Sequence, residues 1–147
     1  MLLIGTKNVG TQTVLDDGTI NIGSVYRKYD RPNSCGVLAF SPPANAITLQ
    51  RQGIYPLTVT LVGSGDVAGD VTVQLLINGE VVDGVFSTQT ITTADTEFRT
   101  FVIDYYILVD KDFVLGRQST IAQSISLQNT GVDATFTSVV VNVTKEV

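Results

Sequence analysis

Apolar and polar residues alternate along two long runs of this chain, at 54–62 and 101–109. Alternation with a period of two is typical of a β-strand with one buried face, because successive side chains point to opposite sides of a sheet. We therefore expect both runs to be strands whose apolar face lies in a core or at a subunit contact. The residues assigned to this face are Tyr55, Leu57, Val59, Phe101, Ile103, Tyr105 and Ile107.

Shorter runs of the same kind, separated by turn residues, follow one another along the chain. Strands are expected at 37–40, 46–49, 71–77, 80–82, 86–92, 121–127 and 135–143. Asn78-Gly79 between two apolar runs predicts a type I′ hairpin turn. Pro56 lacks a backbone donor and predicts an edge position or a bulge in its strand. No segment has a helical period. The pattern predicts an all-β antiparallel β-sandwich, of jelly-roll or immunoglobulin type.

The first 35 residues differ in composition from the rest, because they are polar and rich in turn residues. Residues 30–36 are dense in chain-breaking residues. We therefore expect an N-terminal arm at 1–35 and a compact domain at 36–147. A polar arm of this length buries too little apolar surface to order itself, so it is expected to gain its order from a partner. Its basic and aromatic cluster, which either docks onto a partner or a sugar ring or packs on the domain, is Tyr26, Arg27, Lys28, Tyr29 and Arg31.

Composition supports the strand assignment and narrows the choice of partners. Val, Thr and Ile number 21, 19 and 11, about a third of the 147 residues, and β-branched side chains favour sheets. Only 16% of residues are charged, which indicates either a well-filled core or a covered subunit interface. The net charge is −5, and the nine basic residues are scattered, which argues against a nucleic-acid partner. No apolar stretch reaches the length of a membrane span or a signal peptide, so we expect synthesis in the cytoplasm and no membrane insertion.

Residue types that carry common catalytic chemistry are scarce. The chain has no histidine, which removes the Ser-His-Asp triad and the Cys-His dyad. Cys35 is the single cysteine and can form neither an intrachain disulfide nor a metal site alone. Asp110-Lys111-Asp112 offers oxygen ligands for Ca²⁺, but the ligand set is incomplete and contains a lysine. We expect no catalytic residue, no cofactor and no metal, and hence no enzyme.

Asp104 lies inside the longest alternating run, on the face opposite the Phe101–Val109 stripe. Val102 and Tyr106 share that face. Two interpretations are open for the carboxylate. It is either a solvated acid on an outer surface, or a buried or interfacial acid paired with Arg99 or Arg117.

The order of these motifs resembles the tumour necrosis factor-like and complement-head-like jelly rolls. The resemblance covers about 37–147 and rests on three segments: 47–55 with its Gly-Ile-Tyr ending, 71–82 with its Asn-Gly turn, and 125–130 before a valine-rich last strand. It implies a homotrimer, with the apolar stripes either in the core or around the trimer axis. Bacterial members of this type include heads of spore-surface proteins and small phage or prophage proteins, and the absence of a Gly-X-Y stalk favours the phage group.

The function implied by this resemblance is structural. We expect a homotrimeric module that decorates or completes a larger particle and has other structural proteins as partners. Its expected location is a phage virion, and its synthesis is expected in the host cytoplasm. The alternative is a lectin-like module of the same fold that binds a carbohydrate or a receptor through its loops.

Overall fold

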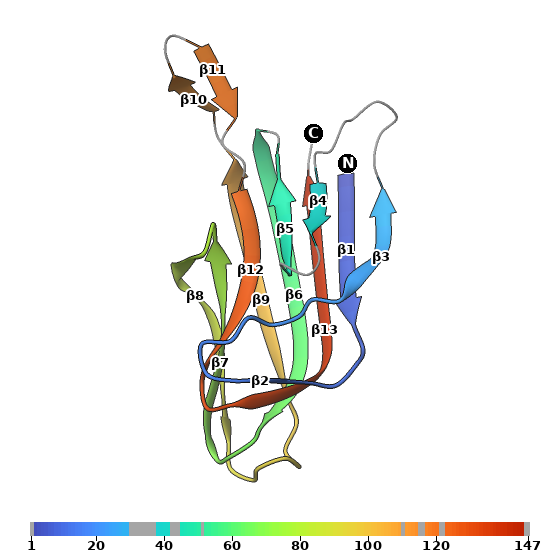
Figure 1. Ribbon diagram of the computed structural model, residues 1–147, viewed down its shortest axis with the longest axis vertical. Coiled ribbons are helices and arrows are strands. Elements are labelled where there is room, and N and C mark those ends of the chain that lie inside the picture. The colour runs from blue at the N-terminus through green and yellow to red at the C-terminus, as the bar shows by residue number, and fades with distance from the viewer. Residues whose placement is uncertain are drawn as a thin grey trace.

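The computed structural model describes residues 2–29, 38–41, 45–50, 52–109, 111–114, 117–120 and 123–145. Within these ranges every regular element is a β-strand, and there is no helix long and apolar enough to cross a membrane. The strands form two antiparallel sheets that lie face to face (Figure 1). The prediction of an all-β sandwich of jelly-roll type is confirmed.

The first sheet has the strand order β3-β1-β13-β6-β9, and the short β2 also pairs with β13. Its strands are β1 (Leu2–Asn8), β2 (Gln12–Val14), β3 (Ser24–Tyr29), β6 (Gly53–Gly65), β9 (Arg99–Val109) and β13 (Ala134–Lys145). The two longest alternating runs of the sequence thus lie next to each other, because the whole of β9 pairs with residues 53–63 of β6.

The second sheet has the strand order β4-β5-β12-β7-β8. Its strands are β4 (Leu38–Ser41), β5 (Ala46–Leu49), β7 (Gly69–Ile77), β8 (Glu80–Ile91) and β12 (Gln123–Gly131). The residues expected to form two strands at 80–82 and 86–92 form the single strand β8, which stays paired with β7 through a register shift between Gln74 and Leu76. A separate two-stranded hairpin, β10 (Lys111–Val114) and β11 (Arg117–Thr120), was not expected.

The turn between β7 and β8 has the geometry that its sequence predicts. Asn78 and Gly79 have φ angles of 54° and 81°, so both central residues are left-handed, as a type I′ turn requires. Pro56 pairs with Tyr106 of β9 on one side of β6. On the other side β6 pairs with β13 only as far as Leu57, so Pro56 lies at a local edge position, as its missing backbone donor predicts.

The core lies between the two sheets and contains the apolar face predicted from the sequence. Six of the seven side chains assigned to that face are buried, and Tyr105 is partly buried and packs against the same core. Phe101 contacts Phe136 of β13 edge to face, with ring centroids 5.9 Å apart. The stripe therefore faces the core of a single chain, and a contact around a trimer axis is not needed to bury it.

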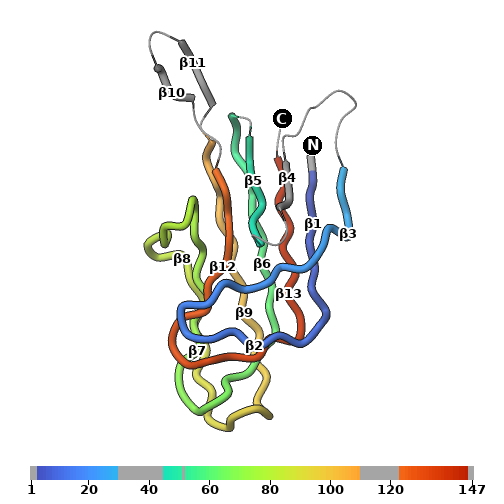
Figure 2. The backbone as a smooth tube through the Cα atoms, in the orientation of Figure 1, coloured from blue at the N-terminus to red at the C-terminus, as the bar shows by residue number. Residues whose placement is uncertain are grey.

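The described part of the expected N-terminal arm belongs to the sandwich. β1 lies between β13 and β3, so it is an interior strand of the first sheet. The segment after β2 then crosses the molecule at β12, where the Ile20 N–H donates to the Leu127 carbonyl at 3.0 Å (Figures 1 and 2). Four apolar side chains of this region are at most 5% exposed, namely Ile4, Val14, Ile20 and Ile22. The expectation of a separate arm is thus wrong for residues 2–29.

A buried amide holds this N-terminal region to the rest of the sandwich. Asn129 on β12 is fully buried, and its Nδ2 donates to the carbonyls of Val14 at 3.0 Å and Val132 at 3.1 Å. One side chain thereby joins the end of β2 to the turn between β12 and β13. Loss of the amide would leave buried carbonyls without a donor.

Candidate assembly surface

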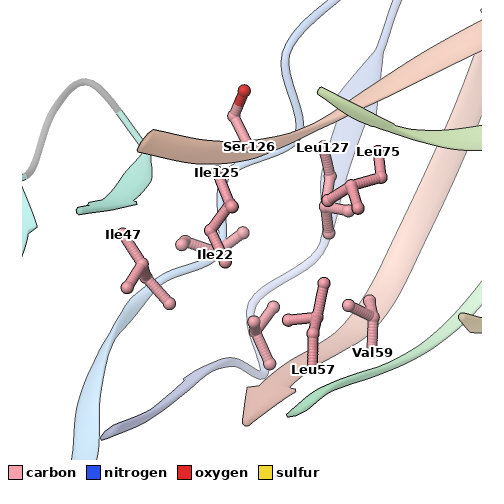
Figure 3. A pocket seen from close by; sticks show the side chains of 9 residues that line it. Ile22, Ile47, Leu57, Val59, Leu75, Ile125, Ser126 and Leu127 are labelled. Atoms are coloured by element: carbon pink, nitrogen blue, oxygen red, sulfur yellow. The ribbon is translucent and has the colours of Figure 1, made fainter. Parts of the chain in front are cut away.

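A void between the two sheets is too small to hold a ligand. It measures about 10 Å³ and is lined by apolar side chains including Ile22, Leu57 and Leu127 (Figure 3). Ser126 points its hydroxyl away from these side chains, as Figure 3 shows. An apolar void of about one water volume stays dry, because a water there would find no hydrogen-bond partners. This void therefore offers no binding site for a ligand.

No group of three or more His, Cys, Asp or Glu within the described ranges is arranged to hold a metal ion. Asp110 and the side chain of Asp112, the sequence candidates for Ca²⁺, lie outside the described residues, as does Cys35.

Glu97, in the loop between β8 and β9, is a carboxylate with a strongly lowered pKa. Hydrogen bonds from the Thr92 hydroxyl at 2.8 Å, the Thr92 N–H at 2.7 Å and the Thr93 N–H at 3.1 Å, and an ion pair with Arg99, lower its pKa to about 2. The carboxylate stays ionised at neutral pH. It closes the loop between β8 and β9, which is a structural role.

The outer face of the first sheet carries exposed apolar side chains along β9 and its neighbour β6. Val102, Tyr106 and Leu108 are 51%, 72% and 62% exposed, and Ile54 of β6, which is paired with Leu108, is 53% exposed. Asp104 is also exposed and lies between Val102 and Tyr106 on this face. We call these five residues the β9 surface. Large apolar groups gathered in this way mark an interaction site more often than singly scattered ones do.

The apolar character continues onto the open edge of the sandwich. β8 and β9 are edge strands of the two sheets, with 12 and 11 residues. A hollow of about 400 Å³ between them is lined by 84–86 and 102–105, and Phe86 at its rim is 58% exposed. Long edge strands with exposed apolar side chains invite pairing with another chain. Gln89 of β8 bridges this edge at one end, where its Nε2 donates to the Thr100 carbonyl of β9 at 3.1 Å.

A basic and aromatic group lies at the opposite edge of the same sheet. The Tyr26 hydroxyl donates to Asn142 Oδ1 at 2.9 Å, and the ring lies so close over Gly5 that a Cβ there would be 2.9 Å from it. The Lys7 Nζ and the Arg27 guanidinium are 5.3 Å and 5.9 Å from the ring centroid, within the range of a cation–π contact. We call Lys7, Tyr26 and Arg27 the basic cluster.

The structure brings together part of the cluster predicted from the sequence and adds a residue to it. All of β3 is exposed, including Lys28 and Tyr29, whereas Arg31 lies outside the described residues. Lys7 was missed because it comes from β1, and only the pairing of β1 with β3 places it near Tyr26. Tyr26 thus packs on the surface of the domain, over Gly5 and Asn142, whereas the exposed Lys28 and Tyr29 are open to a partner.

The structure also bears on the two interpretations of Asp104. Within the chain its carboxylate is exposed, and Arg99 pairs with Glu97 instead. The side chain of Arg117 lies outside the described residues. An outer-surface position is thus established for one copy, and pairing across a subunit contact stays a prediction.

Comparison with known proteins identifies the fold. No protein-family model matches the chain, and no curated protein matches it in sequence. Solved structures of similar fold include Eiger TNF from S. frugiperda, with a TM-score of 0.65 and 10% identity over 100% of this chain and 94% of that one. The globular domain of zebrafish complement 1qA protein has a TM-score of 0.64 and 7% identity, over 100% and 98% of the two chains.

A phage protein has a similar fold as well. The PRD1 vertex protein P5 has a TM-score of 0.52 and 14% identity, over 98% of this chain and 96% of that one. All these identities are low, so the comparisons establish the fold alone. The fold of this chain is the jelly roll of TNF-like and complement-head-like proteins, as the resemblance in its sequence implies.

Proposed function

We propose that this chain is a non-enzymatic assembly module, a homotrimeric jelly roll that forms part of a larger particle such as a phage virion. The observation that carries the proposal is the β9 surface, where four apolar side chains are at least half exposed on two adjacent strands. Removing such side chains from water on association is worth about 25 cal/mol per Å² of apolar area. In the trimer that the resemblance implies, a second copy of the chain would cover this surface.

A mass measurement tests self-association directly. Size exclusion with light scattering at micromolar concentration should give about three times 15.7 kDa. Tyr106→Glu should reduce the assembly to smaller species, because it places a charge in an apolar contact. Val67→Glu is the matched control, since Val67 is also exposed, at 56%, but lies in the loop between β6 and β7. A wild-type monomer, or equal behaviour of the two variants, would contradict the proposal.

The lectin-like alternative is less well supported by the geometry of Tyr26. Both Lys7 and Arg27 lie over its ring, and its hydroxyl is engaged by Asn142, so the ring is not free to stack on a sugar. Tyr29, 60% exposed, is the remaining aromatic candidate on β3. A glycan array separates the two functions. A lectin-like module should give a reproducible signal that Tyr29→Ala abolishes, whereas an assembly module should give no such signal.

The larger particle is the part of the proposal furthest from the chain itself. Its support is the structural likeness to a phage vertex protein and the resemblance to small phage proteins. An antibody raised against the purified trimer should label particles released by the producing cells, as seen by electron microscopy. Absence of label from every particle fraction would reject the virion role and leave the trimer untouched.

A further inference from the structure

The first sheet has an open edge at β3, at the opposite end of the sheet from β9. β3 pairs with β1 alone and lies at the border of the sandwich (Figure 1). All of its side chains are exposed. One side of its backbone has no strand partner among the described residues, so the N–H and C=O groups on that side are open to an extended segment of another chain. We call this open side of β3, with the side chains of Ser24–Tyr29, the β3 edge.

Charge distinguishes the β3 edge from the rest of the molecule. The chain has a net charge of −5, yet β1, β2, β3 and β13 contain no Asp or Glu. The cations on these strands are Lys7, Arg27, Lys28 and Lys145. Within the described ranges the only ion pair is that of Arg99 with Glu97, so no described carboxylate neutralises these four cations. The β3 edge therefore favours an acidic partner.

Arg27 and Lys28 project from opposite faces of β3. Arg27 pairs in register with Gly5, on the outer face where the Tyr26 ring lies. Lys28, which is also exposed, pairs with Ile4, whose buried side chain faces the core. Two adjacent residues of an added strand would likewise project to opposite faces. An added strand with two adjacent acidic residues would thus place one carboxylate beside Arg27 and the other beside Lys28.

The same cations argue against a second copy of this chain as the added strand. Pairing β3 with the β3 of another copy would place Arg27 and Lys28 of the two copies side by side, and like charges across paired strands are destabilising. Charged side chains often protect an edge strand against such pairing. Protection alone does not account for Tyr26 and Tyr29, which are 41% and 60% exposed, since exposed tyrosines beside arginine are typical of a protein interface.

From these observations, and resting on the proposed assembly role, we infer that the β3 edge binds an extended segment of another protein of the particle, which adds to the sheet as a strand and carries two adjacent acidic residues. Main-chain hydrogen bonds to β3 hold the segment whatever its sequence, and the charge pairs with Arg27 and Lys28 select an acidic one. A sulfated polysaccharide would also meet the cations, but it would leave the main-chain groups of β3 unpaired.

Synthetic peptides test this inference on the full chain. The probe is a fluorescent peptide with the sequence Thr-Val-Thr-Asp-Glu-Thr-Val-Thr and blocked ends, and its binding is measured by fluorescence anisotropy. Replacing Asp-Glu by Lys-Lys in the peptide should weaken binding at least about tenfold, because both charge pairs become repulsive. Arg27→Glu with Lys28→Glu in the protein should weaken binding of the acidic peptide as strongly and should make the Lys-Lys peptide the better ligand.

A matched control and the fold of the variants complete this part of the test. Lys145→Glu makes the same kind of charge reversal on β13, which β1 separates from β3, and should change binding by less than about twofold. Arg27 and Lys28 are exposed, so the doubly substituted protein should keep the native circular dichroism spectrum. The Lys-Lys peptide on the wild-type protein tests the charge preference without any substitution in the chain.

Alternate N-methylation of the peptide separates strand addition from attraction between charges alone. In a paired strand the N–H groups of alternate residues point to the same side. Of two acidic peptides, one methylated at its odd positions and one at its even positions, only one should therefore retain binding. Equal behaviour of the two methylated peptides overturns strand addition.

Heparin, a sulfated polysaccharide, tests the other source of negative charge. Binding of heparin without binding of the acidic peptide would make the β3 edge a polyanion site and overturn the inference, as would absence of binding by either. These failures leave the mass of the wild-type assembly unchanged, so the proposed trimer would stand. A wild-type monomer that still binds the acidic peptide would overturn the trimer and leave the β3 edge as a binding site.

Discussion

Removal of the N-terminal region is the perturbation whose outcome the structure decides most sharply. Deleting residues 2–29 takes away β1, which pairs with β13 on one side and with β3 on the other. It also takes away the segment that contacts β12 through Ile20. We expect the remaining chain not to fold, although its composition in this region suggests a dispensable arm.

The stability lost on this deletion can be estimated from the buried side chains that it removes. Ile4, Val14, Ile20 and Ile22 are all buried, and each large apolar side chain contributes about 1.5–3 kcal/mol when it is removed from water. Four of them amount to about 6–12 kcal/mol. A domain of this kind has a total stability of about 5–15 kcal/mol, so the deletion removes most or all of it. It also leaves β13 with an unpaired edge.

The assay is far-ultraviolet circular dichroism with thermal melting, together with the soluble yield. The deleted protein should be insoluble or show no cooperative transition. Ile20→Ala gives a graded version, expected to lower the free energy of unfolding by about 2–5 kcal/mol in urea at a fixed protein concentration. Leu15→Ala, at a side chain 63% exposed, should change it by less than about 0.5 kcal/mol. A deleted protein that melts cooperatively near the wild-type temperature would refute the reasoning.

Three further predictions follow from single side chains. Phe101→Ala should lower the free energy of unfolding by about 3–5 kcal/mol. Thr100→Ala, on the exposed face, should lower it by under about 0.5 kcal/mol. Equal effects of the two substitutions in urea unfolding would show that the buried face is misassigned. Asn129→Ala should lower it by about 1–3 kcal/mol because buried carbonyls lose their donor, and an unchanged urea midpoint would contradict this. The pKa of Glu97 is lowered to about 2, so its contribution is complete above about pH 4.5 and is lost as the pH falls toward 2. Glu97→Gln should therefore melt with less pH dependence than the wild type in that window, and parallel melting curves would exclude the role.

Much of the fold could be predicted because its longest strands carry a local signal. β6 and β9 alternate over nine or more residues, and Asn78-Gly79 dictates the turn that joins β7 to β8. The position of β1 carries no such signal. Its burial depends on pairing with β13, at the other end of the chain. Ile20 and Ile22 are buried although they lie in a segment that is not a strand. Contacts distant in sequence decide these positions, and a local pattern cannot report them.

The candidate surface was predictable only in part for a related reason. Tyr26 and Arg27 are adjacent in the sequence, so composition alone drew attention to them, whereas Lys7 joins them through strand pairing. Ile54 and Leu108 are apolar residues on the face that alternation assigns to solvent. Alternation identifies the buried face of a strand but does not indicate that large apolar side chains also lie on the opposite, exposed face.

The apolar residues on both faces of β9 argue that this edge is covered in the working protein. A strand that is apolar on both sides is typical of one with a layer packed on each side. Within one copy β9 has the core on its inner face, at Phe101 and Ile103, and no described residue covers Val102 or Tyr106 on its outer face. Under the proposed self-association, a neighbouring copy would supply the missing layer. Asp104 in the middle of that face would then contribute specificity where the apolar residues contribute affinity, so its reversal should change which copies associate more than whether the chain folds.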